Sequence, residues 1–282
     1  RIVKGNYERI GGKRSCLRVN VRGEKFEKEK AARNYEEAIK SVLNLIQDKK
    51  YNIVSSLAEI GAVGHRIVHG GEKYSESVLI DDEVVKEIEK CIPLAPLHNP
   101  EGLEGIRATR KVLKDKPMVA VFDTAFHQTL SKMAYIYQIP YKYYEKYKIR
   151  KYGFHGTSHK YVSGRVAEIV NKDIKDLKII NCHIGQGASI CAIDGGKSID
   201  TTMGLTPTAG IPMATRSGDI DPAIIPYIMR HEDLDANEIE RMLNKKSGAW
   251  GVSGVSEDYR DIEREYENGD ERSILALDTQ AY

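Results

Sequence analysis

A five-residue apolar run constrains the fold of this chain more than any other feature. Met118–Phe122 carries no polar side chain, and the run ends at Asp123. Because helix-like patterns flank it, the run predicts a strand buried on both faces, as in a parallel sheet covered by helices. A carboxylate at such a strand end is partly desolvated and lies where α/β proteins bind ligands. Asp123 is therefore a candidate general base or metal-orienting group, and a helix-capping aspartate is the alternative.

Strands and helices are mixed in both halves of the chain. Asn34 and Glu37 have the spacing of a capping box, which predicts a helix start, and an apolar stripe follows at Tyr35, Ile39, Val42 and Ile46. Further helices are expected from Asp81, from Asn99 as a cap, and near residues 222–230, 233–245, 257–267 and 270–282. Strands are expected over residues 16–21, 62–68, 177–182, 189–193 and 198–200. This pattern predicts an α/β protein of two lobes, residues 1–126 and 127–282.

Composition excludes several classes of protein. The 43 Lys and Arg residues against 41 Asp and Glu leave a formal charge of +2, so the chain lacks the basic excess of a nucleic-acid binder. No apolar run approaches the ~20 residues that span a bilayer, and no signal-peptide pattern is present. None of the four cysteines forms a CxxC pair, and Cys91 and Cys182 are expected to be buried, reduced thiols. We therefore expect a cytoplasmic protein without nucleic-acid or membrane partners.

Both ends of the chain interrupt a pattern. Arg1–Val3 already has the character of a strand interior, and Ile274–Tyr282 stops within an apolar-periodic helix without a capping signal. We expect the chain to be a piece of a longer protein.

Most histidines lie at the expected ends of strands or helices, where α/β proteins bind ligands. For each one, a structural hydrogen-bonded role is the alternative. His65 and His69, and likewise His155 and His159, have an i,i+4 spacing that makes a metal site a second alternative. Neither pair has the helix-borne glutamate of a metalloprotease.

A glycine-rich turn and two arginines are candidates for anion binding. The turn His183–Gly187 joins two strands, and its glycines would let backbone N–H groups approach a phosphate. A plain β-hairpin is the alternative. Arg66 and Arg216 have small neighbours that would let a guanidinium enter a cleft and bind a carboxylate or phosphate, whereas a surface ion pair is the ordinary explanation.

Residues 135–152 hold seven tyrosines among lysines and arginine. Aromatic side chains between basic ones can stack bases along a nucleic-acid strand. Because acidic residues elsewhere balance this charge and Pro140 interrupts the stretch, we expect a solvated helix face with its tyrosines packed inward.

Nine motifs follow one another over nearly the whole chain: GHRIVHGGE (64–72), PLAPLHNP (93–100), VFDTAFHQ (121–128), KYGFHGTSH (151–159), HIGQGAS (183–189), GGKSID (195–200), TRSGDIDPAI (215–224), KKSG (245–248) and GVSGVSEDYRD (251–261). Together they resemble the acetate kinase family of the actin-like, sugar-kinase and heat-shock ATPase superfamily. The resemblance implies two lobes of the actin-like ATPase type, both incomplete, and reversible phosphoryl transfer from ATP with Mg²⁺ to acetate, giving acetyl phosphate and ADP.

The resemblance also implies residue roles. Arg66 would hold the acetate carboxylate, Asp123 would position it, and His155 and Arg216 would stabilise the transferring phosphoryl group. The acetate methyl would lie among Val68, Leu97, Phe154 and Pro207. The nucleotide would be bound by His183, Ile184, Gly185, Gln186, Gly187, Asp258, Tyr259 and Arg260. Family members are homodimers, so a homodimer is expected.

Departures from the family pattern leave alternatives open. The family's opening phosphate loop and its later adenosine and magnesium loops are absent from the chain, so it is expected to be inactive alone, with its metal ligands elsewhere. Gln186 replaces an Asn, Ala214 a Gly, and Thr208-Ala209 a Leu-Glu. Another nucleotide or pyrophosphate as donor, propionate as acceptor, and a non-catalytic phosphate-binding fragment are the alternatives.

Overall fold

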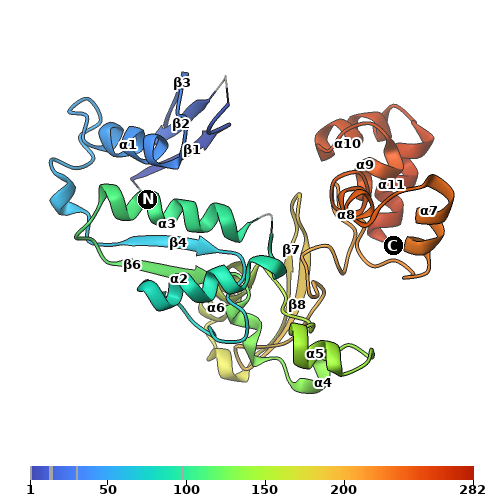
Figure 1. The fold of residues 1–282 in the computed structure, drawn as a ribbon. Coiled ribbons are helices and arrows are strands. Elements are labelled where there is room, and N and C mark those ends of the chain that lie inside the picture. Colours follow the sequence, from blue (N-terminus) through green and yellow to red (C-terminus); the bar gives the residue numbers. More distant parts are fainter. Residues whose placement is uncertain (1, 13–14, 30, 97) are drawn as a thin grey trace. The chain divides into compact units, whose positions relative to one another are not determined.

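The computed structural model describes residues 2–12, 15–29, 31–96 and 98–282. It divides the chain into two compact units, one of Arg1–His69 and Ser77–Val121, the other of Gly70–Glu76 and Phe122–Tyr282 (Figure 1). The expected division at residue 126 differs from this one in two respects. The chain enters the second unit at Phe122, within the buried run, and the short segment Gly70–Glu76 also belongs to the second unit.

The first unit contains two three-stranded sheets. The strands are β1 (Val3–Glu8), β2 (Cys16–Val21) and β3 (Glu24–Glu29), and then β4 (Val63–Ile67), β5 (Val78–Leu79) and β6 (Met118–Phe122). The first sheet is an antiparallel meander, whereas the second has the order β4-β6-β5. Strand β6 is thus central, as its apolar sequence predicts. It runs antiparallel to β5, while its arrow points the same way as that of β4 (Figure 1). The expected parallel pairing therefore holds on one side only.

The helices of the first unit begin close to their predicted caps. They are α1 (Tyr35–Ile46), η1 (Leu57–Glu59), α2 (Asp82–Lys90), η2 (Ile92–Leu94) and α3 (Asn99–Val112). Asn34 caps α1 by accepting the Glu37 N–H at 3.0 Å. The predicted apolar stripe is wrong at Val42, which is exposed, because the buried face of α1 passes through Ala38 and Leu43 instead.

Asn99 is the first residue of α3, and the predicted cap at this position is wrong. Its buried side chain exchanges hydrogen bonds of 3.1 and 3.0 Å with the backbone of His69 and donates to Ile88 O at 3.2 Å. The amide therefore joins three elements, while Pro100 occupies the first turn as expected.

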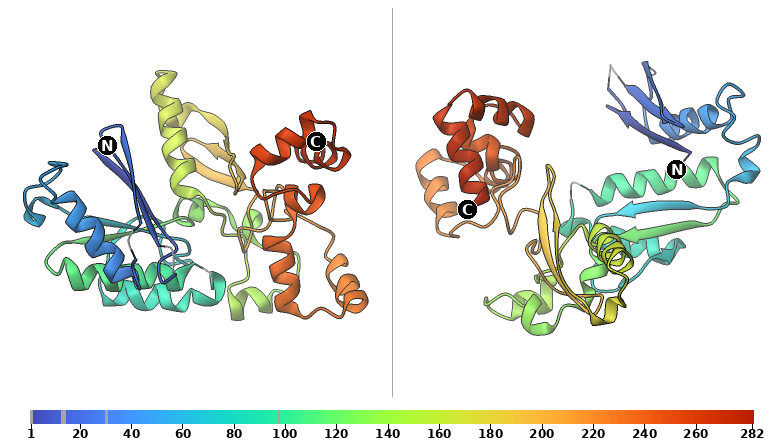
Figure 2. Two further views of the ribbon diagram at one scale, coloured as in Figure 1. Left: turned by 90° about the horizontal axis from the view of Figure 1, so that it is seen from above. Right: turned by 180° about the vertical axis from the view of Figure 1, so that it is seen from behind.

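The second unit is built on the antiparallel sheet β7 (Lys178–His183), β8 (Ser189–Asp194) and β9 (Lys197–Thr201). Helix α6 (Gly156–Ile169) lies along this sheet and contacts β7 (Figure 2). The short helix η3 (Ala125–Thr129), which follows Asp123, packs against β9. All three strands match the predicted ranges, and the loop after His183 lies between β7 and β8.

The remaining elements of the second unit are α4 (Lys132–Tyr135), α5 (Lys142–Tyr147), η4 (Ile174–Asp176), α7 (Ile224–Glu232), α8 (Ala236–Lys245), α9 (Gly248–Ser253), α10 (Tyr259–Glu267) and α11 (Glu271–Ala281). Four of them match the helices predicted after residue 220. Helix α9 was not predicted, because its six residues include two glycines and no apolar repeat.

Two predictions about side-chain burial are wrong. Tyr141, Tyr143 and Tyr147 are exposed, with lysine ammonium groups 4.9–5.3 Å from their ring centres, although Tyr152 is buried as expected. Cys182 is exposed, whereas Cys91 is buried.

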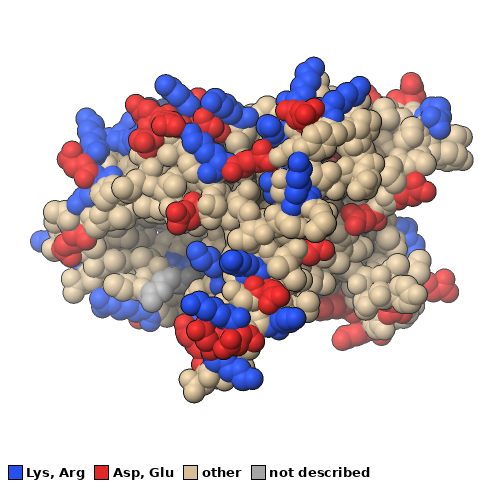
Figure 3. All heavy atoms as spheres, turned by 90° about the horizontal axis from the view of Figure 1, so that it is seen from below, with Lys and Arg blue, Asp and Glu red and all other residues tan. Residues whose placement is uncertain are grey.

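Charged residues of both signs are interspersed on the face drawn in Figure 3. In the part of the chain that the structure describes, none of the helices has the length and apolar character needed to cross a bilayer.

Candidate active site

The loop between β7 and β8 presents its backbone to solvent beside an imidazole ring and a guanidinium group. Ile184, Gly185 and Gln186 are exposed, and Gly187 is half-buried. A β-carbon built on Gly187 would lie 3.4 Å from Nη1 of Arg216 and 3.5 Å from Nε2 of His155. The structure therefore brings together three of the predicted site elements: the glycine loop, His155 and Arg216.

His155 precedes helix α6 in a left-handed conformation, with φ of 58°. Its ring stacks on that of His183 at 4.0 Å between centres. Its Nδ1 lies 2.9 Å from Oγ of Ser189. A left-handed non-glycine residue is strained, and this strain is found where the surrounding structure requires a particular side-chain direction. Here the turn directs the imidazole toward the loop.

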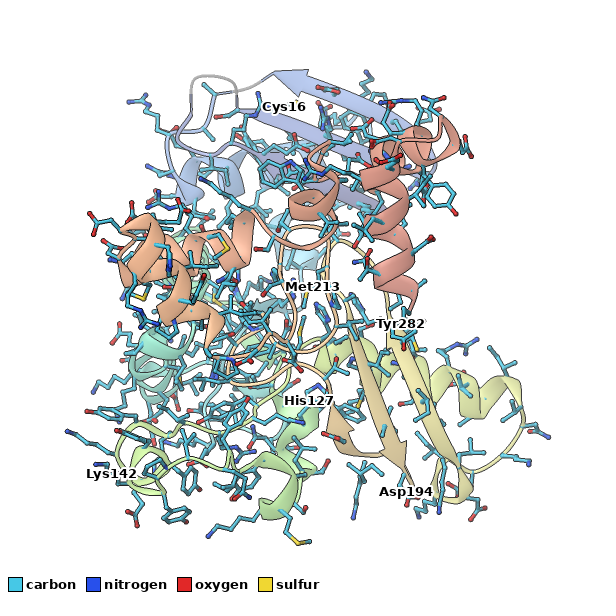
Figure 4. The ribbon with its side chains drawn as sticks, turned by 90° about the vertical axis from the view of Figure 1, so that its right-hand side faces the viewer. Cys16, His127, Lys142, Asp194, Met213 and Tyr282 are labelled. Carbon is cyan, nitrogen blue, oxygen red and sulfur yellow. The ribbon has the colours of Figure 1, made fainter. Side chains whose placement is uncertain are left out.

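Arg216 is a half-buried cation with neutral protein partners. Its Nη1 donates to Pro207 O at 3.2 Å and to the sulfur of Met213 at 3.6 Å (Met213 is labelled in Figure 4). Burial lowers the pKa of Arg216. Across the described ranges, no carboxylate forms an ion pair with this guanidinium. Because a buried charge without a counter-ion is costly, this arrangement favours an anionic ligand at the guanidinium.

The backbone around Arg216 is held by the start of helix α9. Gly248 has φ of 64°, and a β-carbon there would lie 2.1 Å from Met213 O and 2.7 Å from Arg216 O. The Ala249 N–H donates to Met213 O at 2.9 Å, and the Ser247 N–H donates to Thr215 O at 3.0 Å. The motif at residues 245–248 therefore holds the backbone of residues 213–216 in place, and only glycine fits at position 248.

Asp123 is buried, with 2% of its surface exposed, and follows β6 directly. Its carbonyl accepts the Gly156 N–H at 2.9 Å, and a β-carbon at Gly156 would lie only 2.3 Å from this oxygen. The first turn of α6 therefore packs directly on the backbone of Asp123. This contact places Asp123 and His155 at adjoining points of the second unit.

Buried histidines form the interior behind the loop. His127, labelled in Figure 4, bonds through Nδ1 to Ser198 Oγ at 2.8 Å and through Nε2 to Phe154 O at 2.9 Å. His159 lies 2.8 Å from Oγ of Ser189. Burial lowers the pKa of His127 to about 4 and that of His159 to about 4. Both rings are therefore neutral at pH 7, which identifies them as structural donors and acceptors.

The predicted nucleotide residues on α10 form their own local pairs. Asp258 caps the helix and forms an ion pair with Arg260, which lowers the pKa of the carboxyl to about 2. The Tyr259 hydroxyl lies 2.7 Å from the side-chain nitrogen of Gln280, which also donates to Pro212 O at 3.0 Å. Tyr259 is thus connected through Gln280 to the residue that precedes Met213.

Two of the family departures contact one another. The Ala214 N–H donates to Gln186 O at 3.2 Å, and Ala214 is buried, with 3% of its surface exposed. Thr208 Oγ1 lies 2.6 Å from Asn244 Oδ1. The backbones of residues 186 and 214 are therefore joined by one hydrogen bond between two loops.

The other predicted acetate residues are distributed over both units. Arg66, which is exposed, lies on β4 of the first unit, and the half-buried Val68 follows that strand. Leu97 lies outside the described residues. Phe154 and Pro207 belong to the second unit, next to His155 in sequence and within hydrogen-bond distance of Arg216, respectively. The pocket for a methyl group stays a prediction.

The metal-site alternative finds no cluster of ligands. Within residues 2–12, 15–29, 31–96 and 98–282, no three His, Cys, Asp or Glu side chains are arranged to hold a metal ion. His155 and His159 instead share the hydroxyl of Ser189.

Sequence reasoning missed Ser189 and Asn181 and gave His159 no role beyond the metal alternative. Ser189 bonds both His155 and His159, and Asn181 Nδ2 lies 2.7 Å from Nδ1 of His159. The register of β7 and β8 brings these residues to α6, and nothing local in the sequence signals that register.

Comparisons with known proteins agree on one family. The family model described as the acetokinase family matches residues 1–282. The chain belongs to the acetokinase family. The acetate kinase of Thermoanaerobacterium thermosaccharolyticum is 56% identical over all of this chain and 70% of its own length, and that of Acetivibrio thermocellus is 54% identical over all of this chain and 71% of its own.

Solved structures of the family share the fold. A Porphyromonas gingivalis acetate kinase superposes with a TM-score of 0.94 at 48% identity, over 99% of this chain and 70% of its own. A Francisella tularensis propionate kinase superposes with a TM-score of 0.92 at 42% identity, over the same shares of the two chains. The predicted α/β fold of actin-like ATPase type is thereby confirmed. Membership in this family makes the protein a phosphotransferase.

Proposed function

We propose that this protein reversibly transfers the terminal phosphoryl group of ATP to the carboxylate of acetate, giving acetyl phosphate and ADP. The observation that carries the proposal is the guanidinium of Arg216, which has no ion-pair partner among the described residues and lies beside His155 at the glycine loop. Such a group is suited to the equatorial oxygens of a phosphoryl group in transfer, where alignment and neutralisation of charge supply most of the catalysis. The names of the relatives support acetate as the acceptor, and the family resemblance implies ATP as the donor.

The chemistry requires no proton transfer. One acetate oxygen forms a bond to the γ-phosphorus while the bond from that phosphorus to the bridging oxygen of ADP breaks, and the leaving oxygen keeps the electron pair. The carboxylate is already an anion at neutral pH, so a general base is unnecessary. This balance favours a positioning role for Asp123 over the role of a base.

The residue roles in this proposal follow the family motifs. Arg66 holds the acetate carboxylate, His155 and Arg216 contact the transferring group, and the loop His183–Gly187 holds the donor phosphates. The nucleotide lies toward Asp258, Tyr259 and Arg260, and the acetate methyl lies among Val68, Leu97, Phe154 and Pro207. The burial of Asp123 and the position of Arg216 support these roles in the second unit.

Magnesium enters the proposal as part of the donor, MgATP. Mg²⁺ commonly keeps several waters and binds substrate phosphates with one or two carboxylates, so a cluster of three protein ligands is not required. The buried carboxylate of Asp123 fits such a partial ligand set. A homodimer and a cytoplasmic location remain predictions from the family resemblance.

The identity of the donor is tested by the two departures at residues 186 and 214. Because Ala214 is buried within the protein, its methyl has little surface with which to crowd a nucleotide. This burial supports ATP as the donor over the alternatives of another nucleotide or pyrophosphate. The Q186N, A214G double variant should therefore keep the ratio of ATP to GTP turnover within about threefold of the parent.

Trapping of acyl phosphate with hydroxylamine tests the proposed reaction directly. The protein expressed from its complete reading frame should form acetyl hydroxamate only when ATP, Mg²⁺ and acetate are all present. Propionate belongs in the same assay, because one methylene in an apolar pocket changes selectivity by only about 1–3 kcal/mol. Absence of hydroxamate with ATP, GTP and pyrophosphate, from folded protein, would overturn the proposal in favour of a non-catalytic phosphate-binding protein.

A further inference from the structure

A line of hydrogen-bonded side chains runs from strand β7 to His155. Asn181 Nδ2 lies 2.7 Å from Nδ1 of His159, and Nε2 of His159 lies 2.8 Å from Oγ of Ser189. The same hydroxyl lies 2.9 Å from Nδ1 of His155. Asn181, His159 and Ser189 have only 6%, 0% and 0% of their surfaces exposed. Water therefore does not compete within the line, and the groups themselves decide where each proton lies.

The amide at one end gives the line a direction. An amide nitrogen can only donate, so Nδ1 of His159 accepts, and the neutral ring carries its proton on Nε2. That N–H donates to Ser189 Oγ. A hydroxyl has one proton, and among the described residues the only other group within hydrogen-bond distance of this hydroxyl is Nδ1 of His155. Nδ1 of His155 therefore accepts, which leaves the proton of a neutral His155 on Nε2.

The charged groups near His155 are Asp123, whose carbonyl accepts the N–H of Gly156, and Arg216, whose guanidinium disfavours a charged ring. The ring stacks on His183 at 4.0 Å, and its Nε2 edge faces Gly187 beside the guanidinium of Arg216. A neighbouring positive charge makes a second one more costly. The Nδ1 of His183 lies 2.8 Å from Ser158 Oγ, so the two stacked rings have separate hydroxyl partners.

We propose that Asn181, His159 and Ser189 are positioning residues that hold His155 neutral, with its proton on Nε2 and directed at the glycine loop. His155 then acts on the transferring phosphoryl group as a neutral N–H donor, and the positive charge comes from arginine. The identity of the group that His155 contacts rests on the proposed function. The direction of the line belongs to the protein itself and can be measured without turnover.

Long-range ¹H–¹⁵N spectra of the full-length protein, labelled at histidine, test the direction. The His155 signals are assigned as those lost in His155→Gln. At pH 7.5, Nδ1 of His155 should resonate as an unprotonated ring nitrogen and Nε2 as a protonated one. Protonation of both nitrogens, or of Nδ1 alone, would overturn the proposal. Protonation of Nδ1 alone would mean that the side-chain oxygen and nitrogen of Asn181 exchange places and that each hydrogen bond in the line runs in the opposite direction.

Variants of the line test the cause. Ser189→Ala should give a mixture of the two His155 tautomers and lower kcat by about tenfold, the scale of one lost hydrogen bond, with the KM for acetate within about twofold. Ser158→Ala is the matched control, because it removes the hydroxyl that bonds His183 and should leave the His155 tautomer unchanged. An unaltered tautomer in Ser189→Ala would contradict the proposal.

His159 supplies a second variant if Ser189→Ala does not fold. In His159→Gln the side-chain amide can still donate to the Ser189 hydroxyl, so the Nε2–H form of His155 should persist, whereas His159→Leu should lose it. Equal spectra in these two variants would overturn the role of His159. If the wild-type spectrum shows the expected tautomer but no acyl phosphate forms, the positioning stands and the proposed function fails.

Discussion

The guanidinium of Arg216 is the side chain on which the proposed chemistry depends most. It is half-buried, its protein partners are a carbonyl and a thioether, and the start of helix α9 holds the backbone around it. The protein thus maintains a cation ready for an anionic ligand, without a side-chain rearrangement when the ligand arrives.

Replacing Arg216 should therefore reduce turnover strongly. We expect Arg216→Ala to lower kcat for acetyl hydroxamate formation by about 10²–10³-fold, and Arg216→Lys to recover only part of this loss because an ammonium cannot bind two phosphoryl oxygens at once. Arg230→Ala on α7 is the control, since Arg230 is exposed and should have no effect. Activity of Arg216→Ala near that of the parent would remove Arg216 from the site.

The buried histidines predict how stability depends on pH. Burial lowers the pKa values of His127 and His159 to about 4, whereas unfolded histidine titrates near 6.5. Between these values the unfolded chain binds more protons, so the free energy of unfolding should fall as pH falls from 6.5 to about 4, by up to about 1.4 kcal/mol per pH unit for each ring.

Urea unfolding at pH 7, 6 and 5 measures this dependence. The His159→Gln variant lacks one of the two groups and should show a smaller slope, although it is less stable at pH 7. His231→Gln is the control, because the ring of His231 lies on the exposed α7 helix. A slope unchanged in His159→Gln would show that His159 does not remain neutral in the folded protein.

At the scale of single residues, the sequence was informative where a motif carried the chemistry. Asp123, His155 and Arg216 were predicted, and the structure brings the latter two to Gly187. Ser189 and Asn181 were not predicted as partners of histidines, because their contacts depend on strand register and on the position of α6, which no local pattern specifies.

At the scale of elements, helix α6 is fixed to Asp123 by its first residue. A β-carbon at Gly156 would lie 2.3 Å from Asp123 O and 3.0 Å from Cβ of Phe126. The first of these atoms belongs to the backbone and the second is bonded to it. Neither atom can therefore move away without displacing the backbone. The small residue at this position is a requirement of packing between α6 and the end of β6.

Two glycines on the same helix provide a matched test. Gly156→Ala should destabilise the protein by about 1–3 kcal/mol through overpacking and should also lower activity, because it displaces Asp123 or His155. Gly164→Ala, where nothing lies within 4 Å, should be neutral or stabilising by about 0.5–1 kcal/mol. Thermal unfolding measures the stability of both variants, and equal stability in the two would contradict the close packing of Gly156 on Asp123.

Element prediction succeeded where caps and periodicity agreed, as at Asn34 for α1 and Asp81 for α2. It failed where tertiary contacts took precedence over local preference. Asn99 joins His69 and Ile88 instead of capping its helix. Helix α9 forms because Gly248 packs on the backbone of residues 213–216. Neither contact is visible in the neighbouring sequence.

At the scale of the whole molecule, the proposal requires residues of both units. Arg66 lies on β4 of the first unit, while Asp123, His155 and Arg216 belong to the second. The overall fold was predictable, because nine motifs in family order specify it more strongly than any one element does. The division between the units was harder to predict, because Gly70–Glu76 joins the second unit through contacts such as the hydrogen bond from Gly70 N–H to Thr124 Oγ1 at 3.2 Å.

Arg66 supplies a test at this scale. Arg66→Ala should raise the KM for acetate by about tenfold or more and lower kcat, with little change in the KM for ATP, because a lost charge-assisted contact to a carboxylate costs at least about 1.4 kcal/mol. Arg107→Ala is the control in the same unit, where the exposed Arg107 pairs with Glu89 and Glu104. A normal KM for acetate in Arg66→Ala would exclude Arg66 from acetate binding.

The most direct measurement is a crystal structure of the full-length protein with acetate, ADP and aluminium fluoride, a planar mimic of the transferring phosphoryl group. The account predicts that Arg66 contacts the acetate carboxylate and that His155 Nε2 and Arg216 lie within about 3.5 Å of the fluoride ligands. Acetate bound away from Arg66 and Asp123, or fluorides out of reach of both His155 and Arg216, would contradict it.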